Sequence, residues 1–256
     1  MGDTAGMKTR TCPASTRRAA GALTVVAAAL LAACPPARAN DRPFESARTA
    51  VAEDDDQVWS FEVWGRQIGR LRSLTVEPDY SFDPANSVQI ELTRQLDRQG
   101  QDSGHEVELE YKHLFNRLAR DGWGWGISAA LGAERNASGS ARTLALRLPL
   151  SVDLGHIGRG ADGSASGSLL HLNLGVQKTG SARRQWASAV AFEQPLPQRS
   201  LLFAELARDG AAQLAQVGVR HWLRREKLAI DLAWQQRRGD GERSAGWVAG
   251  IGWYDL

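Results

Sequence analysis

Residues 143–152 read TLALRLPLSV, and this stretch decides the fold class. A leucine or valine occupies every second position from Leu144 to Val152, and alanine, arginine, proline and serine lie between them. Successive side chains of a strand point to opposite faces, whereas apolar residues on one helix face recur every three or four positions. The stretch therefore predicts a β-strand with one apolar and one mixed face.

The same period of two recurs from Gln57 onward, as in VQIELT at 88–93 and LAIDLAWQ at 228–235. Each run has about ten residues, the length that a tilted strand needs to cross a hydrocarbon core of about 30 Å. An even number of such strands suits a closed antiparallel barrel. The pattern predicts an all-β fold, an antiparallel transmembrane β-barrel of about 12 strands over residues 57–256. The expected strands begin near residues 57, 70, 86, 105, 122, 142, 168, 185, 199, 213, 226 and 246.

A soluble β-sandwich or lipocalin-like barrel would show the same alternation, with the apolar face turned inward. The mixed faces distinguish the two classes, because they combine charges such as Glu91, Glu108 and Arg147 with many glycines and alanines. In a narrow lumen, small residues make room and opposite charges pair. This composition favours the membrane barrel.

Residues 1–39 have the layout of a secretory signal peptide. A basic start is followed by an apolar run over residues 19–33, and Ala37-Arg38-Ala39 offers a cleavage site that would make Asn40 the first mature residue. The alternative is a lipoprotein box, Leu31-Ala32-Ala33-Cys34, which would leave a lipidated Cys34. Both routes imply export, and we expect the mature chain in the outer membrane.

Removal of the signal peptide changes the charge. It takes away five of the 31 Lys and Arg residues and one of the 29 Asp and Glu residues, which leaves 26 basic and 28 acidic residues. The mature chain therefore gives no reason to expect nucleic-acid binding. Both cysteines, Cys12 and Cys34, lie in the removed part, so neither a disulfide nor a thiolate metal site is expected. Residues 40–56 end in Glu53-Asp54-Asp55-Asp56 and predict a flexible acidic extension.

Aromatic residues are expected to form a belt at each end of the barrel, where indole and phenol rings are stable between hydrocarbon and headgroups. With a periplasmic N-terminus, strand parity places one group at periplasmic ends and another at extracellular ends. The periplasmic group is Trp59, Tyr80, Phe82, Phe115, Trp123, Trp125, Trp253 and Tyr254, and the extracellular group is Trp186, Trp234 and Trp247. The Gly-rich connection over residues 155–167 falls on the periplasmic side, where turns are usually short.

The sequence offers no recognisable catalytic motif. Lipid-modifying enzymes of the outer membrane carry a histidine and a serine two residues apart on one strand, and none of the five histidines is followed by serine at that distance. The histidines and carboxylates lack metal-ligand spacing, and GRGADG at residues 158–163 precedes an expected strand rather than the helix that a phosphate-binding loop needs. We expect no catalytic, cofactor or metal site.

Polar residues with inward register form the one candidate site. They belong to successive strands, so the lumen should bring them together, either as a paired network that closes the interior or as the lining of a selective pore. Glu205 and Arg220 are expected to be partners across the interior. The candidate lumen network is Glu193, Glu205, Arg220, Asp231, His171 and Asn173.

Short motifs in the second half resemble one known family. They are LHLNLG at 170–175, Phe192-Glu193, FAEL at 203–206, QVGVR at 216–220 and GIGW at 250–253. In this order they resemble outer-membrane proteins of the MetA-pathway-of-phenol-degradation type, over the span from Leu74 to Leu256. The resemblance implies an outer-membrane β-barrel with a transport role and leaves its substrate open. The chain departs from that family in the Gly-rich insertion before Leu169 and in its end, because barrels of this kind usually present a terminal Phe or Trp to the assembly machinery.

Together these features predict a passive channel or small-solute transporter, with hydrophobic or aromatic compounds among its candidate solutes. The expected partners are outer-membrane lipids, the barrel-assembly machinery and a small solute. The alternative is a structural barrel with a closed lumen and no transport. An outer-membrane lipid-modifying enzyme is the third class.

Overall fold

The computed structural model describes residues 43–51, 57–97, 100–136, 139–157, 167–239, 241–254 and 256. The expected signal peptide with Cys34, the acidic run of residues 53–56 and most of the Gly-rich connection lie outside the described residues. The barrel belongs to the compact unit formed by residues 34–256.

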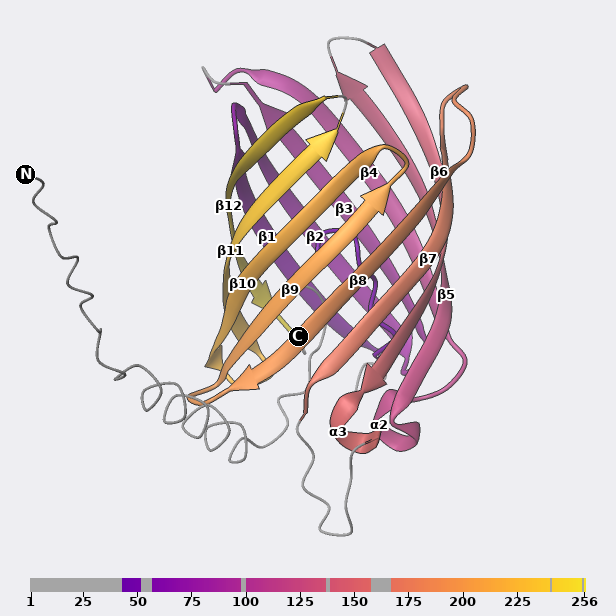
Figure 1. Cartoon of the computed structure of the whole chain (residues 1–256), viewed down its shortest axis with the longest axis vertical. Helices are drawn as coiled ribbons and strands as arrows, with labels where there is room; N and C mark the ends of the chain where they lie inside the picture. The colour runs from indigo at the N-terminus through magenta and orange to yellow at the C-terminus, as the bar shows by residue number, and fades with distance from the viewer. Residues whose placement is uncertain are drawn as a thin grey trace, which may run out of the picture. The chain divides into compact units, whose positions relative to one another are not determined.

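Twelve antiparallel strands in the described residues form one closed barrel, in which each strand pairs with its neighbours in sequence and β1 pairs with β12 (Figure 1). This confirms the expected fold and strand number. The strands are β1 (Val58–Ile68), β2 (Leu71–Asp83), β3 (Asn86–Leu96), β4 (Asp102–Leu114), β5 (Trp123–Asn136), β6 (Gly139–Asp153), β7 (Leu169–Thr179), β8 (Gln185–Leu196), β9 (Ser200–Asp209), β10 (Ala212–Arg224), β11 (Leu228–Gly239) and β12 (Glu242–Trp253).

The apolar face of each strand points outward. Leu131, Leu174 and Leu206 are each more than 60% exposed, whereas polar residues of the opposite register, such as His171 and Glu205, are almost completely buried. A soluble barrel would bury the leucines and expose the charges. The outer surface is therefore the apolar band that a transmembrane barrel presents to lipid.

The two ends of the barrel differ in their connections. The terminal end is the end at which β1 begins and β12 stops, and the hairpin end is the opposite one. Helix α2 (Leu118–Asp121), which links β4 to β5, and helix α3 (Leu154–Ile157), which follows β6, both lie at the terminal end (Figure 1). The long connection after β6 therefore begins and ends at the same end of the barrel as the start of β1 and the end of β12, as the strand parity predicts. Within the described residues no helix is long and apolar enough to cross a membrane.

The seam between β1 and β12 closes the barrel, and Gly246 is the seam glycine with the closest approach to the opposite strand. Gly246 pairs with Ile68, and a Cβ atom on it would lie 1.7 Å from the carbonyl oxygen of Gln67. No side chain fits at that distance. Gly65 on the same seam is different, because its nearest neighbour would be 3.9 Å away, in ordinary contact.

Several aromatic residues that the strand parity assigns to the terminal end lie there. At the terminal end the ring of Trp59 lies 4.8 Å from that of Tyr80, and the ring of Phe115 stacks at 4.3 Å on Trp125. The prediction for Tyr254 is wrong, because its side chain does not join the outer belt but turns into the lumen, where it is 2% exposed. Trp123 and Trp253 also lie at the terminal end, and Trp186 lies at the start of β8 near the hairpin end. Trp234 and Trp247, expected near extracellular strand ends, instead pair with each other at the middle of β11 and β12.

Candidate functional site

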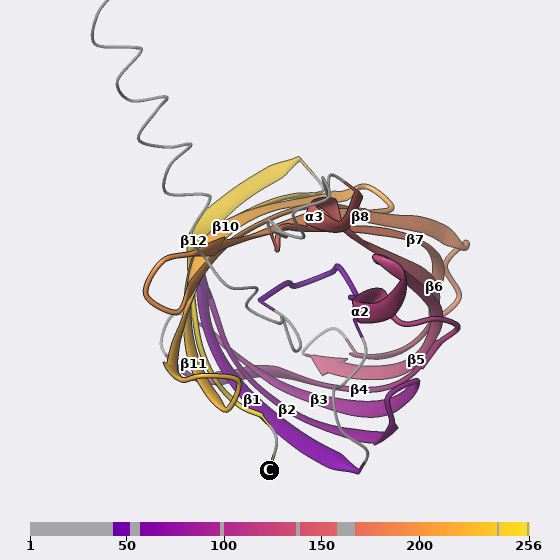
Figure 2. The same ribbon diagram turned by 90° about the horizontal axis from the view of Figure 1, so that it is seen from below.

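Residues 43–51, which we call the inner segment, cross the interior of the barrel (Figure 2). Phe44, Ala47, Arg48 and Ala50 are all buried. The prediction that residues 40–56 form a flexible extension is therefore wrong for residues 43–51, which are buried in the lumen. Acidity identified the extension, but the acidic run lies at 53–56, and residues 43–51 read PFESARTAV, with small and apolar side chains that fit a lumen.

The carboxylate of Glu205 on β9 holds the backbone of the inner segment. Glu45 N donates to Oε2 at 2.8 Å, and Ser46 N and Ala47 N donate to Oε1 at 2.8 and 2.6 Å. Hydrogen bonds to a carboxylate are stronger than bonds between neutral groups. The expected Glu205–Arg220 pair is wrong, since these backbone groups are the partners of Glu205.

Three polar side chains from other strands form further hydrogen bonds with the backbone of the inner segment. Asn173 on β7 bonds both backbone groups of Arg48, accepting from its N at 2.9 Å and donating to its O at 2.8 Å. Gln216 donates to the carbonyl oxygen of Pro43 at 2.7 Å, and Ala50 N donates to Ser151 Oγ at 2.8 Å. Lumen side chains thus replace the strand partner that the inner segment lacks.

Ion pairs fix both charged side chains of the inner segment. Arg48 binds Glu110 at 2.6 Å and Glu108 at 3.2 Å, both on β4. Glu45 binds Arg66 at 2.6 Å and also contacts Arg237. Burial raises the pKa of the Glu45 carboxyl, but the charges of Arg66 and Arg237 together lower this pKa by a larger amount. The pKa of Glu45 therefore lies below its ordinary value.

A second cluster, centred on Arg220, lies on the wall formed by β10, β11, β12 and β1. Arg220 forms a two-point ion pair with Asp231, at 2.8 and 3.0 Å, and lies 3.5 Å from Glu62. Tyr254 donates to Glu62, and the Arg220 guanidinium lies 5.3 Å from the Tyr254 ring. The sequence reasoning omitted Glu62 and Tyr254 from the network, although the inward register of Glu62 could have identified it.

His171 connects two neighbouring strands beneath the inner segment. Its Nδ1 lies 2.7 Å from Ser151 Oγ, and its Nε2 lies 3.4 Å from Glu193. The three side chains have the order of a nucleophile, base and acid, but each is at most 1% exposed, and Phe44 packs on the histidine ring at 5.5 Å. The three side chains therefore pack against the inner segment, through Phe44 on His171 and the bond from Ala50 N to Ser151. Sequence reasoning missed Ser151 because it searched one strand at a time, whereas Ser151 pairs with His171 across β6 and β7.

A polar vestibule of about 420 Å³ lies on the hairpin side of the inner segment. Glu45 and Arg48 contribute to its lining, together with residues of strands all around the barrel. The charged wall residues are Arg66, Arg72, Arg147, Arg237, Glu91, Glu106, Glu108, Glu134 and Asp209. Such a lining can solvate small polar or charged molecules. In the described part of the chain, no group of three His, Cys, Asp or Glu residues could hold a metal ion.

No protein-family model and no curated protein matches the sequence. Among solved structures, the chain is similar to the KdgM porin in complex with disordered oligogalacturonate, with a TM-score of 0.53, 9% identity and coverage of 76% of this chain and 98% of that one. It is also similar to the NanC porin, with a TM-score of 0.51, 9% identity and coverage of 75% and 98%. The fold is that of outer-membrane porins. At this identity the likeness extends to the fold alone, and the resemblance to the MetA-pathway family is supported only in its barrel.

Proposed function

We propose that this chain is an outer-membrane channel for small polar solutes, gated by its own inner segment. The main support for the proposal is the way in which the inner segment is held inside the lumen. Among the described residues, a single stretch, residues 43–51, crosses the lumen, and it is held by hydrogen bonds and ion pairs to side chains rather than by strand pairing. These contacts can break without disturbing the barrel wall.

The width of the barrel supports a lumen that can conduct. Eight strands enclose an interior that side chains alone can fill, and the diameter grows with strand number. The twelve strands here leave space that a separate segment occupies, with a vestibule beside it. The proposal requires that displacing the inner segment connects the vestibule with the terminal end, past the buried Arg220 and Tyr254.

The vestibule favours polar solutes over the hydrophobic or aromatic ones expected from the sequence. Its walls carry guanidinium and carboxylate groups, including Arg147 and Arg237 beside Glu108 and Asp209. An aromatic hydrocarbon would displace water from these charges without replacing its hydrogen bonds. Small sugars and their acids can supply those bonds, and they are the class to test first.

A structural barrel with a permanently closed lumen is the second candidate. The observation that favours it is the close fit of the inner segment, whose Ala47 and Ala50 are fully buried. In this case the buried ion pairs of Arg48 would stabilise the barrel, and the inner segment would never leave the lumen.

Conductance in a planar bilayer separates the two. The test variant replaces residues 43–51 with a Gly-Ser sequence of equal length, so that the chain keeps its connectivity but loses Phe44, Arg48 and the docking geometry. We expect brief openings from the native protein and a steady, several-fold larger conductance from the variant. Heat-modifiable gel mobility shows that both are folded. A folded variant that does not conduct would establish the structural barrel.

A further inference from the structure

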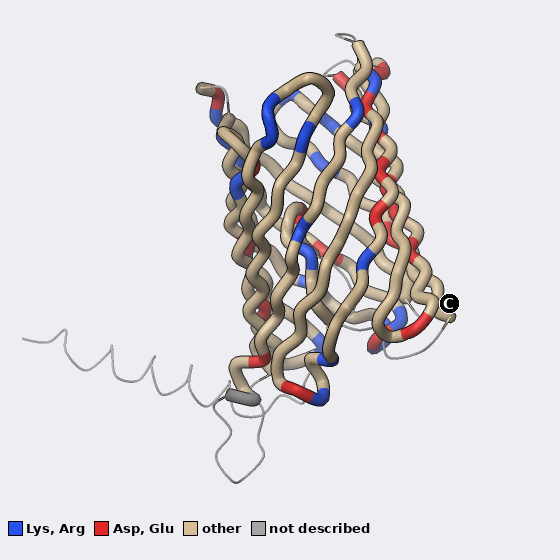
Figure 3. The backbone as a smooth tube through the Cα atoms, turned by 90° about the vertical axis from the view of Figure 1, so that its right-hand side faces the viewer, with Lys and Arg blue, Asp and Glu red and all other residues tan. Residues whose placement is uncertain are grey.

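The strands carry basic residues with outward register near the hairpin end, and Figure 3 shows blue Lys and Arg positions along the upper parts of the strands. Six of these residues are exposed and belong to six different strands. We call them the basic girdle, which consists of Arg135, Arg142, Lys178, Arg208, Arg238 and Arg243.

The strand register places the girdle at the edge of the apolar band. Lys178 pairs directly with Leu144, whose side chain is 57% exposed. Arg208 follows the outward Leu206 by two residues, and Arg238 follows Trp234 by four. Because side chains two or four residues apart share a face, these cations lie just beyond the hydrocarbon-facing surface.

The girdle has an excess of positive charge. Within the described ranges, none of its six members has a carboxylate within 4 Å; the nearby Arg94 does, with Asp102 at 3.4 Å. The terminal end carries outward aromatic rings such as Trp59 and Trp125, and its exposed cations Arg120 and Arg225 pair with the neighbouring carboxylates of Asp121 and Glu226. An anionic layer at the hairpin end would complement the girdle.

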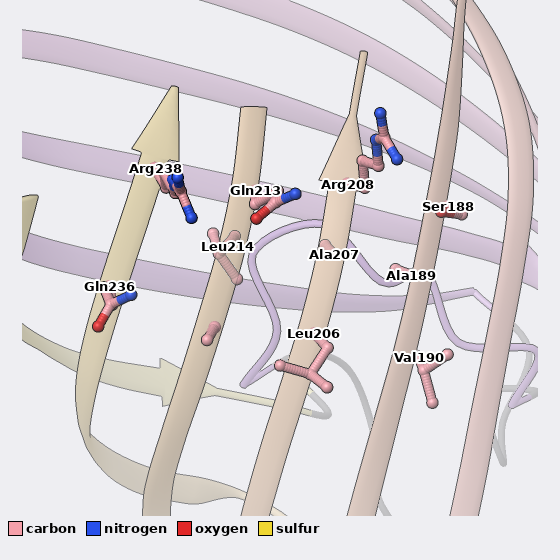
Figure 4. A pocket seen from close by; sticks show the side chains of 11 residues that line it. Ser188, Ala189, Val190, Leu206, Ala207, Arg208, Gln213, Leu214, Gln236 and Arg238 are labelled. Carbon is pink, nitrogen blue, oxygen red and sulfur yellow. The ribbon is translucent and has the colours of Figure 1, made fainter. Parts of the chain in front are cut away.

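One part of the girdle borders a groove of about 400 Å³ on the outer surface of β8 to β11 (Figure 4). Small outward residues, Ser188 and Ala215, leave the space. Leu206 and Val190 line its lower part, and Arg208 and Arg238 lie at its upper part, toward the hairpin end. The groove therefore has an apolar end in the band and a cationic end in the girdle.

We propose that this groove binds one phosphate-bearing, acylated lipid of the outer leaflet, of the lipopolysaccharide class. An acyl chain would lie against Leu206 and Val190, and a phosphate would lie between Arg208 and Arg238. Guanidinium groups bind phosphate through paired, charge-assisted hydrogen bonds. A soluble anion would leave the apolar end unused, and a neutral lipid would offer the two guanidinium groups no anionic partner, although Arg208 also donates to the carbonyl oxygen of Gly210 at 2.9 Å. The inference rests on the membrane placement proposed above and not on conduction.

Native mass spectrometry of the full barrel in neutral detergent tests the proposal with a phosphorylated lipid A and its dephosphorylated form as probes. We expect one phosphorylated lipid per barrel and at least tenfold weaker binding of the dephosphorylated form. Arg208→Gln with Arg238→Gln should weaken binding about a hundredfold, since two charge-assisted interactions are lost. Arg135→Gln with Arg142→Gln removes the same charge from the girdle outside the groove and should leave this binding unchanged.

A groove-filling variant identifies the lipid as the ligand. Ala215→Trp leaves both arginines in place but occupies the acyl position, and it should abolish lipid binding while the barrel keeps its heat-modifiable mobility. Equal binding by the Arg208/Arg238 variant, or by the dephosphorylated lipid, would overturn the proposal. So would competition by millimolar inorganic phosphate that Ala215→Trp does not affect, since this identifies a soluble anion. A barrel that binds the lipid but never conducts would refute the channel alone.

Discussion

At the scale of single residues, the carboxylate of Glu205 takes the place of a strand partner. It accepts three backbone N–H groups in succession, from Glu45, Ser46 and Ala47. A carboxylate can do this because its two oxygens offer about four lone-pair sites and no donor. A carboxamide of the same shape keeps one acceptor oxygen and presents an N–H₂ group to the other donors.

Glu205→Gln should therefore release the inner segment. Each lost bond to the charged group contributes about 1.5–3 kcal/mol, so the exposed fraction of the inner segment should rise at least tenfold. A single cysteine at Ala47 reports this through its rate of labelling by a water-soluble maleimide, because the mature chain should contain no other cysteine. Glu134→Gln in the vestibule wall is the matched control. Equal labelling rates in the two variants would show that Glu205 does not hold the segment.

The pKa of Glu45 predicts a response to acid. Because Arg66 and Arg237 lower this pKa in the docked state, docking is stabilised above the ordinary value of 4.5. That contribution is lost as the pH falls through the lower pKa of the docked carboxyl. We expect bilayer conductance to increase as the pH falls below about 4.5. Glu45→Gln should already show increased opening at pH 7, and a variant with native conductance at pH 7 would contradict the assignment.

Leu174 tests which face meets lipid, because it is 63% exposed at the middle of β7. Leu174→Arg should destabilise the barrel in vesicles by about 2–4 kcal/mol, the cost of an arginine near the midplane. Ser244→Arg, on the vestibule wall, should cost much less in the same urea titration. The neighbouring Asn173 is a poorer control than its inward register indicates, since it binds the backbone of Arg48. Similar costs for both variants would argue against the lipid-facing assignment.

At the scale of elements, the strands could be predicted from the sequence and the inner segment could not. Starts expected near 57, 86 and 168 are observed at Val58, Asn86 and Leu169, because the period of two is a local property of each strand. The inner segment has no period, and the side chains that bind its backbone lie more than 100 residues away in sequence. Only the closed barrel brings those partners around it.

The seam between β1 and β12 gives the prediction for this scale. Gly246→Ala places a methyl group against the Gln67 carbonyl and should destabilise closure by more than about 2 kcal/mol, with partial loss of the heat-modifiable band. Gly65→Ala lies on the same seam with room for a methyl group and should fold normally. Native-like mobility of the Gly246 variant would show that the seam can shift to admit a side chain.

At the scale of the whole molecule, the two ends differ in chemistry. Aromatic rings such as Trp59 and Trp125 lie at the terminal end, and the basic girdle, whose members have no carboxylate partner among the described residues, lies at the hairpin end. The inward register of all six expected network residues followed from strand parity, but their partners did not, because parity gives a face and not a height or a neighbour. Arg220, for example, pairs with Asp231 on the adjacent strand rather than with Glu205.

This asymmetry predicts the orientation of the barrel. The hairpin end should face outward, where phosphate-rich lipid complements the girdle. Ser181→Cys, between β7 and β8, should react with an impermeant maleimide on intact cells. Gln198→Cys, in the turn between β8 and β9 at the terminal end, should react only after the cells are permeabilised. The reverse pattern would invert the barrel and remove the basis for a lipid site at the girdle.

The position of the inner segment in the chain has a consequence for how quickly the lumen can close again. Only five residues, 52–56, separate Val51 from Gln57, and five residues extend at most about 18 Å. A released segment therefore stays near its site, at a local concentration on the order of millimolar. Reclosure is intramolecular and independent of protein concentration, so single-channel records should show short open times that dilution does not change. A free peptide with the sequence of residues 43–51 should block the Gly-Ser variant only when its own concentration approaches that range.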